Sequence, residues 1–414
     1  MKLSWYKMLG PGLLYAGAAI GVSHLVQSTR AGAEFGYGLV WAIVIANILK
    51  YPFFEAGPRY AAVTGNSLLH GYKNLGNWVL YLFIGITVST MFIIQSAVTV
   101  VTAGLVSEIT GLVFSPWIIS AVLLAICLAI LLLGNYSFLD KAMKLIIVVL
   151  TLTTIVALGF SLLGNPAQHE MYLTTFSFAN NKHILFLIAL MGWMPAPLDI
   201  SVWHSVWAVE KNKALSEKVS LKASLLDFKI GYFGTFILAF CFLGLGASTI
   251  YGTGIELASS GGGFAKQLIA IYTNTLGDWA YLIIALAAFT TMFSTTLTCL
   301  DAFPRVLSPA TEMIRGSNPS RENRWYKFWL VIVVIGTVLI LSLFLTNMKT
   351  MVDFATKVAF LTSPVIAILN YLVINRKTFP EQYRQPKFLK ITSWIGIVYL
   401  IGFSVYFLWL SSFN

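Results

Sequence analysis

Long apolar runs, each about twenty residues in length, recur from one end of this chain to the other. A helix needs about that length to cross the hydrocarbon core of a bilayer, and only helices and closed barrels satisfy all of their backbone polar groups in lipid. Hydrophobic residues form 58% of the sequence and charged residues 10%, which excludes a soluble domain with a polar surface. We therefore predict an all-α integral membrane protein. Its eleven predicted spans lie near residues 9–29, 36–58, 77–106, 114–134, 139–163, 183–206, 223–248, 276–300, 325–346, 350–375 and 389–411.

The basic residues indicate the orientation of these spans. Lys and Arg gather before the first span and in the even-numbered connections, whereas the odd-numbered connections hold almost none. Because positive charge is retained on the cytoplasmic side, we predict a cytoplasmic amino terminus and an external carboxyl terminus, in a bacterial inner membrane or a plasma membrane. The lipid bilayer thus accounts for the net charge of +11, and no nucleic-acid partner is expected. The charged start Met1–Lys7 precedes an apolar run without a cleavage site, which predicts a retained first helix.

Two of the apolar runs contain sequences that interrupt a helix. The first run reads Ala-Ile-Gly-Val-Ser-His over 19–24, and the sixth reads Trp-Met-Pro-Ala-Pro-Leu-Asp over 193–199. An interrupted helix exposes backbone carbonyls and amides, so in lipid it persists only where it lines a cavity or binds a solute. The interruptions occur at matching places in the two halves of the chain. This arrangement favours a transporter with a central substrate site over an open channel.

Four short motifs add a family resemblance. They are Gly10-Pro11 at the start of the first span, the Ala-Gly-Ala-Glu-Phe-Gly-Tyr-Gly-Leu-Val-Trp stretch over 31–41, Val63-Thr64-Gly65, and Met194-Pro195 in the sixth span. With these motifs the chain resembles the Nramp family of divalent-metal transporters. The resemblance implies the leucine-transporter-like fold, in which two inverted five-helix repeats, here 9–163 and 183–375, precede an extra helix at 389–411 within one transmembrane domain, 1–414. It also implies a secondary transporter that moves a divalent metal cation by alternating access.

The expected substrate site departs from the family pattern. Family members carry Asp-Pro-Gly-Asn in the first span, and by spacing from the flanking motifs those positions are Gly21, Val22, Ser23 and His24. Their Met-Pro-His motif in the sixth span corresponds here to Met194-Pro195-Ala196, and a Gln in the tenth span corresponds to Thr362. The family's metal-binding carboxylate is therefore lost, while the thioether ligand is kept.

The third span departs from the pattern as well. Family members that couple to protons carry acidic residues in it, whereas the run 78–106 contains no Asp or Glu. A proton relay along this helix would have no titratable carrier. We therefore expect proton coupling to be weak or absent.

Three side chains are the predicted ligands if the substrate is a metal: His24, Met194 and Asp199. Imidazole nitrogen and thioether sulfur suit transition metals, and Asp199 would replace the lost carboxylate. Each also has a structural alternative, in which His24 bonds to a backbone carbonyl, Met194 packs, and Asp199 caps the second half of its broken helix. Gly21, Ser23 and Thr362 complete the predicted substrate-binding set.

Two ion pairs are predicted at the inner ends of spans. Glu55 and Arg59 are four residues apart in the second span, and Asp301 and Arg305 have the same spacing in the eighth, so each pair shares one helical face. We assign both pairs to structure or gating. Asp353 lies close to the predicted outer surface, where charged side chains reach water, and it is not predicted to mark a conduction path.

Three substrate classes remain open. The first is a transition-metal ion bound by the three predicted ligands and backbone carbonyls. The second is a divalent cation that keeps more of its water, such as magnesium. The third is a small organic solute, an amino acid or amine, in a site that has lost the metal. No cofactor is expected, and an enzyme is not expected either, because the five histidines are scattered without catalytic spacing.

Overall fold

The computed structural model describes residues 10–133, 136–163, 173–215, 219–316, 322–344 and 347–412. Within these ranges the ordered elements are helices and no strand occurs, which confirms the all-α prediction. The first half comprises α2 (Pro11–Ala19), a π-helical segment (Val22–Ser28), α3 (Thr29–Phe35), α4 (Val40–Thr64), α5 (Leu68–Leu75), α6 (Asn77–Thr110), α7 (Pro116–Leu133) and α8 (Tyr136–Leu163). The second half comprises α9 (Asn181–Trp193), α10 (Ile200–Leu215), α11 (Leu221–Thr249), α12 (Gly261–Leu276), α13 (Tyr281–Arg315), α14 (Glu322–Phe344), α15 (Met348–Asn375) and α16 (Lys387–Ser412), with short 3-10 turns at Asp278–Ala280 and Glu381–Tyr383.

Every predicted span coincides with a helix or with two parts of an interrupted one. In the described part of the chain, eight helices are individually long and apolar enough to cross a membrane: α4, α6, α7, α11, α13 with its preceding turn, α14, α15 and α16. The first and sixth predicted spans fall short because each is divided, and the described side chains of α8 cover a shorter apolar stretch, Val148–Leu163. The total of eleven spans and their orientation stay predictions.

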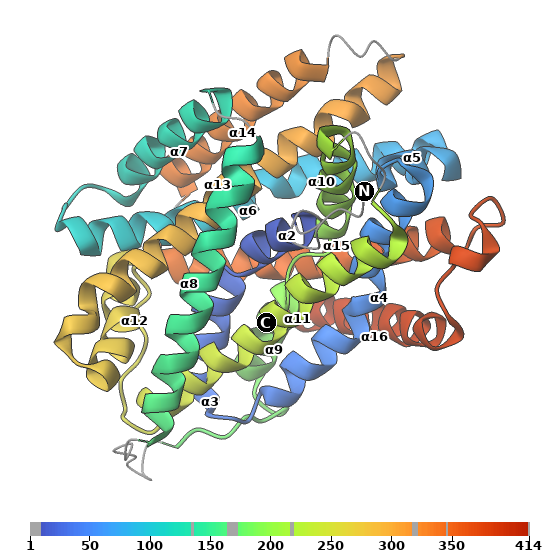
Figure 1. Ribbon diagram of the computed structural model, residues 1–414. Helices are drawn as coiled ribbons and strands as arrows, with labels where there is room; N and C mark the ends of the chain where they lie inside the picture. The colour runs from blue at the N-terminus through green and yellow to red at the C-terminus, as the bar shows by residue number, and fades with distance from the viewer. Residues whose placement is uncertain are drawn as a thin grey trace.

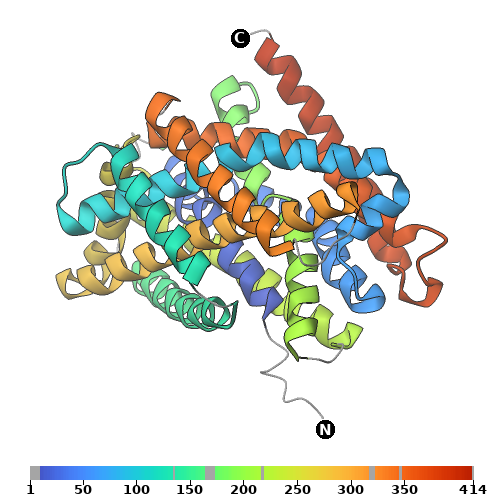
Figure 2. The ribbon, with the colours of Figure 1, turned by 90° about the horizontal axis from the view of Figure 1, so that it is seen from above.

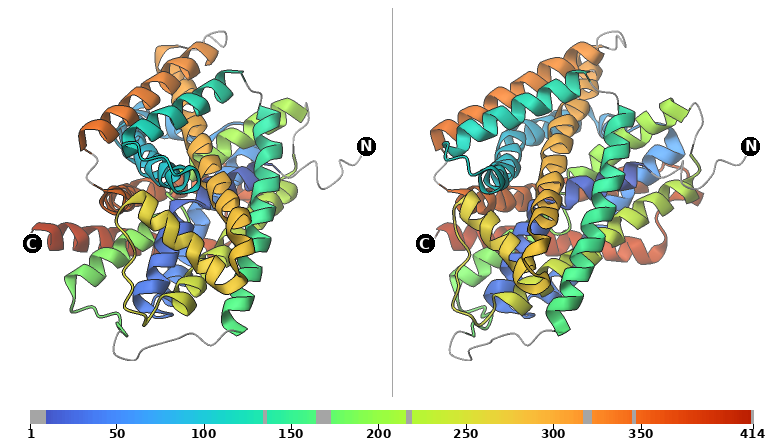
Figure 3. Two further views of the ribbon diagram at one scale, coloured as in Figure 1. Left: turned by 90° about the vertical axis from the view of Figure 1, so that its left-hand side faces the viewer. Right: turned by 60° about the vertical axis from the view of Figure 1, so that its left-hand side comes forward.

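The interrupted first span lies inside the bundle (Figures 1 and 3). α11 packs along both α2 and α3, while α10, α13 and α8 also contact α2. α6 and α13 pack on one another and on α14, and α7 lies beside α14 at the edge (Figure 3). α16 packs on α4 and α15 and projects from the rim of the bundle (Figure 2).

Helices at the rim expose large apolar side chains. Val122 and Ile126 of α7 are 56% and 47% exposed, and Ile335 and Leu339 of α14 are 52% and 53% exposed. A soluble protein would bury rows of apolar side chains like these, whereas a membrane protein exposes them to lipid. The outer surface of the bundle therefore agrees with a multi-pass membrane protein.

Glycines allow α11 to contact the first span backbone to backbone. A Cβ added to Gly231 would overlap the carbonyl group of Gly12 in α2, and one added to Gly246 would overlap the carbonyl oxygen of Thr29 in α3. Without a hydrophobic effect between helices in lipid, close packing of small residues is a main source of helix association. One uninterrupted helix thus holds both halves of the first span.

The glycine contact can be tested on two positions of the same helix. Gly231→Ala should destabilise the protein by about 1–3 kcal/mol, because the new methyl group overpacks a backbone contact. Gly234 is the matched control, since a Cβ there meets nothing within 4 Å. Gly234→Ala should leave stability unchanged or raise it by up to about 1 kcal/mol through helix propensity. Thermal unfolding of the two purified variants in detergent measures the difference, and equal melting temperatures would contradict the assignment.

Candidate functional site

The first helix break lies at Ile20 and Gly21. α2 ends at Ala19, and Gly21 has φ −141° and ψ −123°, far from helical values, before the π-helical segment begins at Val22. Thr295 of α13 packs directly on this break, since a Cβ on Gly21 would lie 2.7 Å from its methyl carbon. Its hydroxyl is 3.0 Å from the carbonyl oxygen of Gly17 and 3.2 Å from that of Ile20. A hydroxyl from another helix thus reaches carbonyls that the break leaves without helical donors.

The second break extends over 194–199, between α9 and α10. Pro195 and Pro197 have no backbone N–H, so neither can continue the hydrogen-bond ladder of α9. The Met194–Pro195 peptide bond is cis. The Ser23 hydroxyl lies 3.3 Å from the carbonyl oxygen of Pro195, and this contact joins the two breaks directly. The prediction that both helices are interrupted is confirmed.

A small cavity lies where the two breaks meet. It is lined by Ala18, Ala19, Val22, Ser23, Ile94, Val98, Trp193, Pro197, Ile200, Trp203, Thr295 and Cys299. The cavity offers about 20 Å³ to the centre of a water molecule, which is room for about one water. The polar side chains among the lining residues are the hydroxyls of Ser23 and Thr295, the thiol of Cys299 and the indoles of Trp193 and Trp203. This hollow at the meeting point of two broken helices is the candidate substrate site.

His24 is fully buried beside this cavity, but it is not among the described lining residues. Its Nε2 lies 2.9 Å from the carbonyl oxygen of Thr235 in α11. Its Nδ1 lies 3.0 Å from the carbonyl oxygen of Ala19 and 2.7 Å from the hydroxyl of Ser23. Both ring nitrogens therefore have protein partners in this conformation, which agrees with the structural alternative for this residue. A role for His24 as a ligand stays a prediction.

The other predicted site residues are distributed around the cavity. Gly21 contacts Thr295, and Ser23 lines the cavity. Met194 is fully buried outside the described lining, and the Thr362 hydroxyl of α15 donates back to the carbonyl of Ala359 at 3.1 Å. Of the predicted set, Ser23 is among the described lining residues, and Gly21 lies next to the lining residue Thr295.

Asp199 is a buried carboxylate at the start of α10. The residue is 3% exposed, and within the described residues its carboxylate has no hydrogen-bond or ion-pair partner. The backbone carbonyl of Asp199 does accept from Val202 and Trp203, as at the start of a helix. The predicted side-chain cap is therefore not formed in this conformation. Within the same described residues no three His, Cys, Asp or Glu side chains gather closely enough to hold a metal ion.

Two charged side chains that the sequence analysis did not single out hold the ends of the broken helices. Lys50 of α4 donates to the carbonyl oxygens of Met191 and Gly192, in the last turn of α9, at 2.6 and 2.9 Å. Asp227 of α11 accepts from the backbone N–H groups of Gly10 and Gly12, at the start of α2, at 3.1 and 2.7 Å. Each charge complements the helix dipole at that end. Their signal in the sequence is an ionisable residue within or bordering an apolar run.

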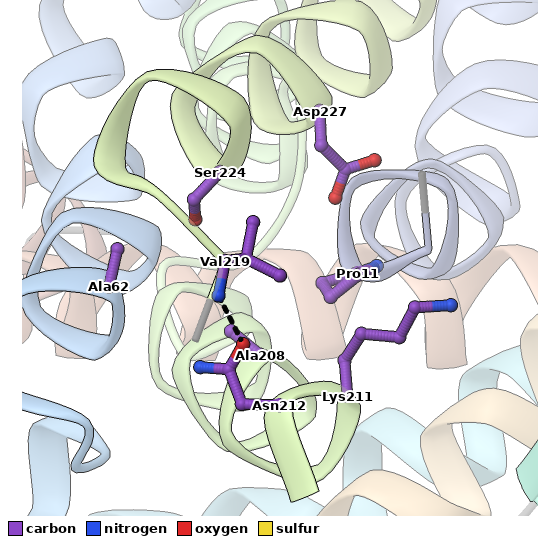
Figure 4. Close-up of a pocket in the computed structure, with 8 residues that line it drawn as sticks. All are labelled: Pro11, Ala62, Ala208, Lys211, Asn212, Val219, Ser224 and Asp227. Carbon is purple, nitrogen blue, oxygen red and sulfur yellow. Dashed lines mark hydrogen bonds between the residues drawn. The ribbon is translucent and has the colours of Figure 1, made fainter. Parts of the chain in front are cut away.

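Figure 4 shows the surroundings of Asp227. Its carboxylate points toward Pro11, at the start of α2, and Lys211 of α10 lies on the other side of that helix end. Asn212 accepts a hydrogen bond from the backbone N–H of Val219 at 3.1 Å. The start of the first span is thus enclosed by polar groups of α10 and α11.

A second charged contact connects α3 with α15. Arg30, 4% exposed, donates to the Asp353 carboxylate at 2.6 Å, and the Gln27 amide donates to the same oxygen at 3.1 Å. The Arg30 guanidinium also lies 4.9 Å from the centre of the Phe186 ring in α9. The Asp353 side chain is 24% exposed, so its place near the outer surface stays a prediction, and the structure adds a buried partner for it. Asp353 anchors a buried arginine that joins both broken spans to α15.

The two predicted ion pairs are both present. Arg59 contacts Glu55 at 2.7 Å and also donates to the carbonyl of Tyr383 before α16, while Arg305 contacts Asp301 at 2.6 Å. Their helical spacing places each pair on one face, as predicted. Tyr326 of α14 donates to Asp301 at 2.7 Å. Whether these pairs gate a pathway stays a prediction.

The interface between α6 and α13 is polar but contains no carboxylate along 78–106. Gln95 donates to the carbonyl oxygen of Thr296 at 3.2 Å, and the hydroxyls of Thr102 and Thr296 are 2.7 Å apart. α6 continues to Thr110, and Glu108 belongs to its last turn, beyond the predicted stretch. These contacts join the helices with amides and hydroxyls, which do not ionise at neutral pH.

Cys299 provides a chemical test of the cavity. Cys127 and Cys241 do not line it, so Cys127→Ala with Cys241→Ala leaves Cys299 as the reporter thiol. We expect any metal ion or amino acid that fills the cavity to slow maleimide labelling of Cys299 severalfold, because the occupied site excludes the reagent. Labelling is followed by mass spectrometry, with the protein unfolded in SDS as the reference. A compound that raises the melting temperature yet leaves the labelling rate unchanged would place the substrate site elsewhere.

The fold is shared with a metal transporter of known structure. The crystal structure of a histidine-to-alanine mutant of the Eremococcus coleocola manganese transporter matches with a TM-score of 0.73 at 13% sequence identity. The match covers 98% of this chain and 87% of that one. At this identity the likeness concerns the arrangement of helices alone, which is the leucine-transporter-like fold.

Sequence comparison extends over the same length. An uncharacterized protein of Pasteurella multocida (strain Pm70) is 34% identical over 412 residues, or 98% of this chain and 94% of that protein. The divalent metal cation transporter MntH of Staphylococcus saprophyticus is 21% identical over 419 residues, or 97% of this chain and 91% of that protein. The profile of the Nramp family, described as natural resistance-associated macrophage protein-like, matches residues 12–410. This chain therefore belongs to the Nramp family of membrane transporters.

Proposed function

We propose that this protein is a secondary transporter that moves a divalent metal cation across a membrane by alternating access. The observation that carries the proposal is the meeting of two broken helices beside one small cavity, where the Ser23 hydroxyl contacts the Pro195 carbonyl. Family membership and the likeness to an MntH divalent metal cation transporter support the substrate class. The repeats at 9–163 and 183–375 are the bodies that would move relative to one another.

The chemistry of the cavity favours a cation that keeps part of its water. The lining side chains offer hydroxyls, a thiol and indole groups but no carboxylate, and a bare double charge in a low-dielectric site requires compensating ligands. A partly hydrated ion needs fewer charged ligands, and magnesium retains water readily. We propose that Asp199, buried and without a bonded partner among the described residues, supplies negative charge when the site widens around the ion.

A small organic solute is the second candidate. The same absence of carboxylate from the described lining favours it, because backbone amides and carbonyls of broken helices bind amino and carboxylate groups without a metal. The two candidates make different demands on Asp199. A divalent cation requires the negative charge of Asp199, whereas an amino acid, which carries no net charge, can bind through hydrogen bonds to the broken helices.

Arg30 and Asp353 are the proposed closure on the outer side. Their contact joins α3 to α15 at the end of the first span that the distribution of basic residues places outside. Charge-assisted hydrogen bonds of this kind contribute about 1.5–3 kcal/mol. Loss of the contact would shift the population toward an outward-open state, as expected for a gate with two discrete arrangements.

This closure predicts a specific change in accessibility. Asp353→Asn should speed labelling of Cys299 by an external maleimide about tenfold, because one weakened charge-assisted contact is worth more than about 1.4 kcal/mol. Glu210→Gln is the matched control, since it removes an exposed pair with Lys213 that lies 2.8 Å apart. Equal labelling rates in both variants would exclude Arg30 and Asp353 as a gate.

Uptake into proteoliposomes tests the proposed function. We expect accumulation of manganese or magnesium, reported by an internal metal-sensitive dye, without acidification reported by an internal pH dye. Asp199→Asn should reduce uptake at least about tenfold, because a buried charge that pairs with the ion is worth several kcal/mol. Amino-acid uptake that survives Asp199→Asn would reverse the order of the two candidates. Substrate-dependent acidification would instead show proton coupling.

A further inference from the structure

Lys50 is a buried lysine in the middle of α4. Its side chain has no exposed area, and within the described residues no carboxylate pairs with it. An ammonium without a counter-charge in a membrane interior is costly, so its surroundings must supply compensation. Three groups do so: the carbonyl oxygens of Met191 and Gly192, and the face of the Phe360 ring at 6.0 Å.

The two carbonyls belong to the last turn of α9, next to the second break. The final four carbonyls of a helix have no helical donor, and they carry the negative end of the helix dipole. In carriers built on discontinuous helices, such half-helix ends coordinate the coupling sodium ion or proton. Lys50 therefore places its positive charge at the carbonyl end of a half-helix. Carriers of this fold bind an exchangeable cation at such ends.

We propose that the Lys50 ammonium is a tethered replacement for a coupling cation at the end of α9, so that this protein binds no alkali metal ion there. The inference rests on the proposed function, since a coupling cation has meaning only in a carrier. The 2.6 Å contact with Met191 is as short as charge-assisted hydrogen bonds, in agreement with a charged donor.

A tethered charge has a different consequence from a bound ion. An ion leaves the site during each transport cycle and thereby couples its gradient to the substrate, whereas Lys50 stays attached to α4 in every conformation. This attachment leaves the carbonyls at the end of α9 with a donor that does not exchange with the solution. Together with the uncharged interface between α6 and α13, it removes a route by which an ion gradient would drive transport.

Removal of the ammonium should convert the position into an ion site. Lys50→Ala frees both carbonyls and the volume of the side chain, whereas Lys50→Met frees the carbonyls but keeps most of that volume filled. We expect sodium, lithium or potassium chloride to raise the melting temperature of purified Lys50→Ala by about 3 °C or more over N-methyl-D-glucamine chloride of equal ionic strength. Lys50→Met and the unaltered protein should show no such difference.

Chemical rescue provides a second measurement on the same variant. Methylammonium or ethylammonium chloride should raise the melting temperature of Lys50→Ala, since a small ammonium ion restores the donors to Met191 and Gly192. Neither salt should stabilise Lys50→Met, in which the side chain fills the space.

A folded Lys50→Ala protein that responds neither to alkali ions nor to alkylammonium ions would overturn the proposal. If Lys50→Ala yields no folded protein, the proposal is tested on the unaltered protein. Its melting temperature should be the same in sodium, potassium and N-methyl-D-glucamine chloride, and specific stabilisation by sodium would contradict a tethered replacement. These melting temperatures do not depend on transport. Failure of metal uptake in proteoliposomes would therefore reject the proposed function without changing the outcome for Lys50.

Discussion

The structure depends on one constraint, which is that backbone polar groups inside a bilayer must find partners within the protein. Each break in a membrane helix creates carbonyls and amides that the helix itself no longer satisfies. Here other helices supply the partners: Thr295 of α13 for the first break and Lys50 of α4 for the end of α9. The conformation of the broken helices is thus determined largely by α4, α11 and α13.

This constraint is the reason that some features were predictable from the sequence. Gly21 and Pro195 marked the breaks because glycine and proline both disfavour a continuous helix, and matching interruptions in two apolar runs are typical of carriers. The family profile and the shared fold confirm the resemblance drawn from the short motifs. The pairs Glu55–Arg59 and Asp301–Arg305 were predictable because both partners lie on one helix, where spacing alone determines contact.

Contacts between distant segments were not predictable in this way. Asp353 and Arg30 are 323 residues apart, and nothing local to either residue indicates the other. The candidate site shows the same limit, because Thr295 and Cys299 lie on α13, where the sequence had indicated the Asp301–Arg305 pair but no site residue. His24 was identified by its position, but the direction of its ring depends on the π-helical segment that follows the break and on Thr235 of α11. Lys50 did carry a signal, since a lysine within an apolar span is costly unless other groups compensate its charge.

The glycine contacts of α11 bear on how the first span can move. Gly231 and Gly246 contact α2 and α3 on opposite sides of the break, so the two halves share one continuous support. If α2 or α3 bent away on its own, its backbone contact with α11 would open, and the glycines there have no side chain to fill the gap. Small residues present a smooth surface, however, and two such surfaces slide past one another with little steric resistance. We therefore expect α2 and α3 to slide along α11 together, and we do not expect the first span to bend at Gly21.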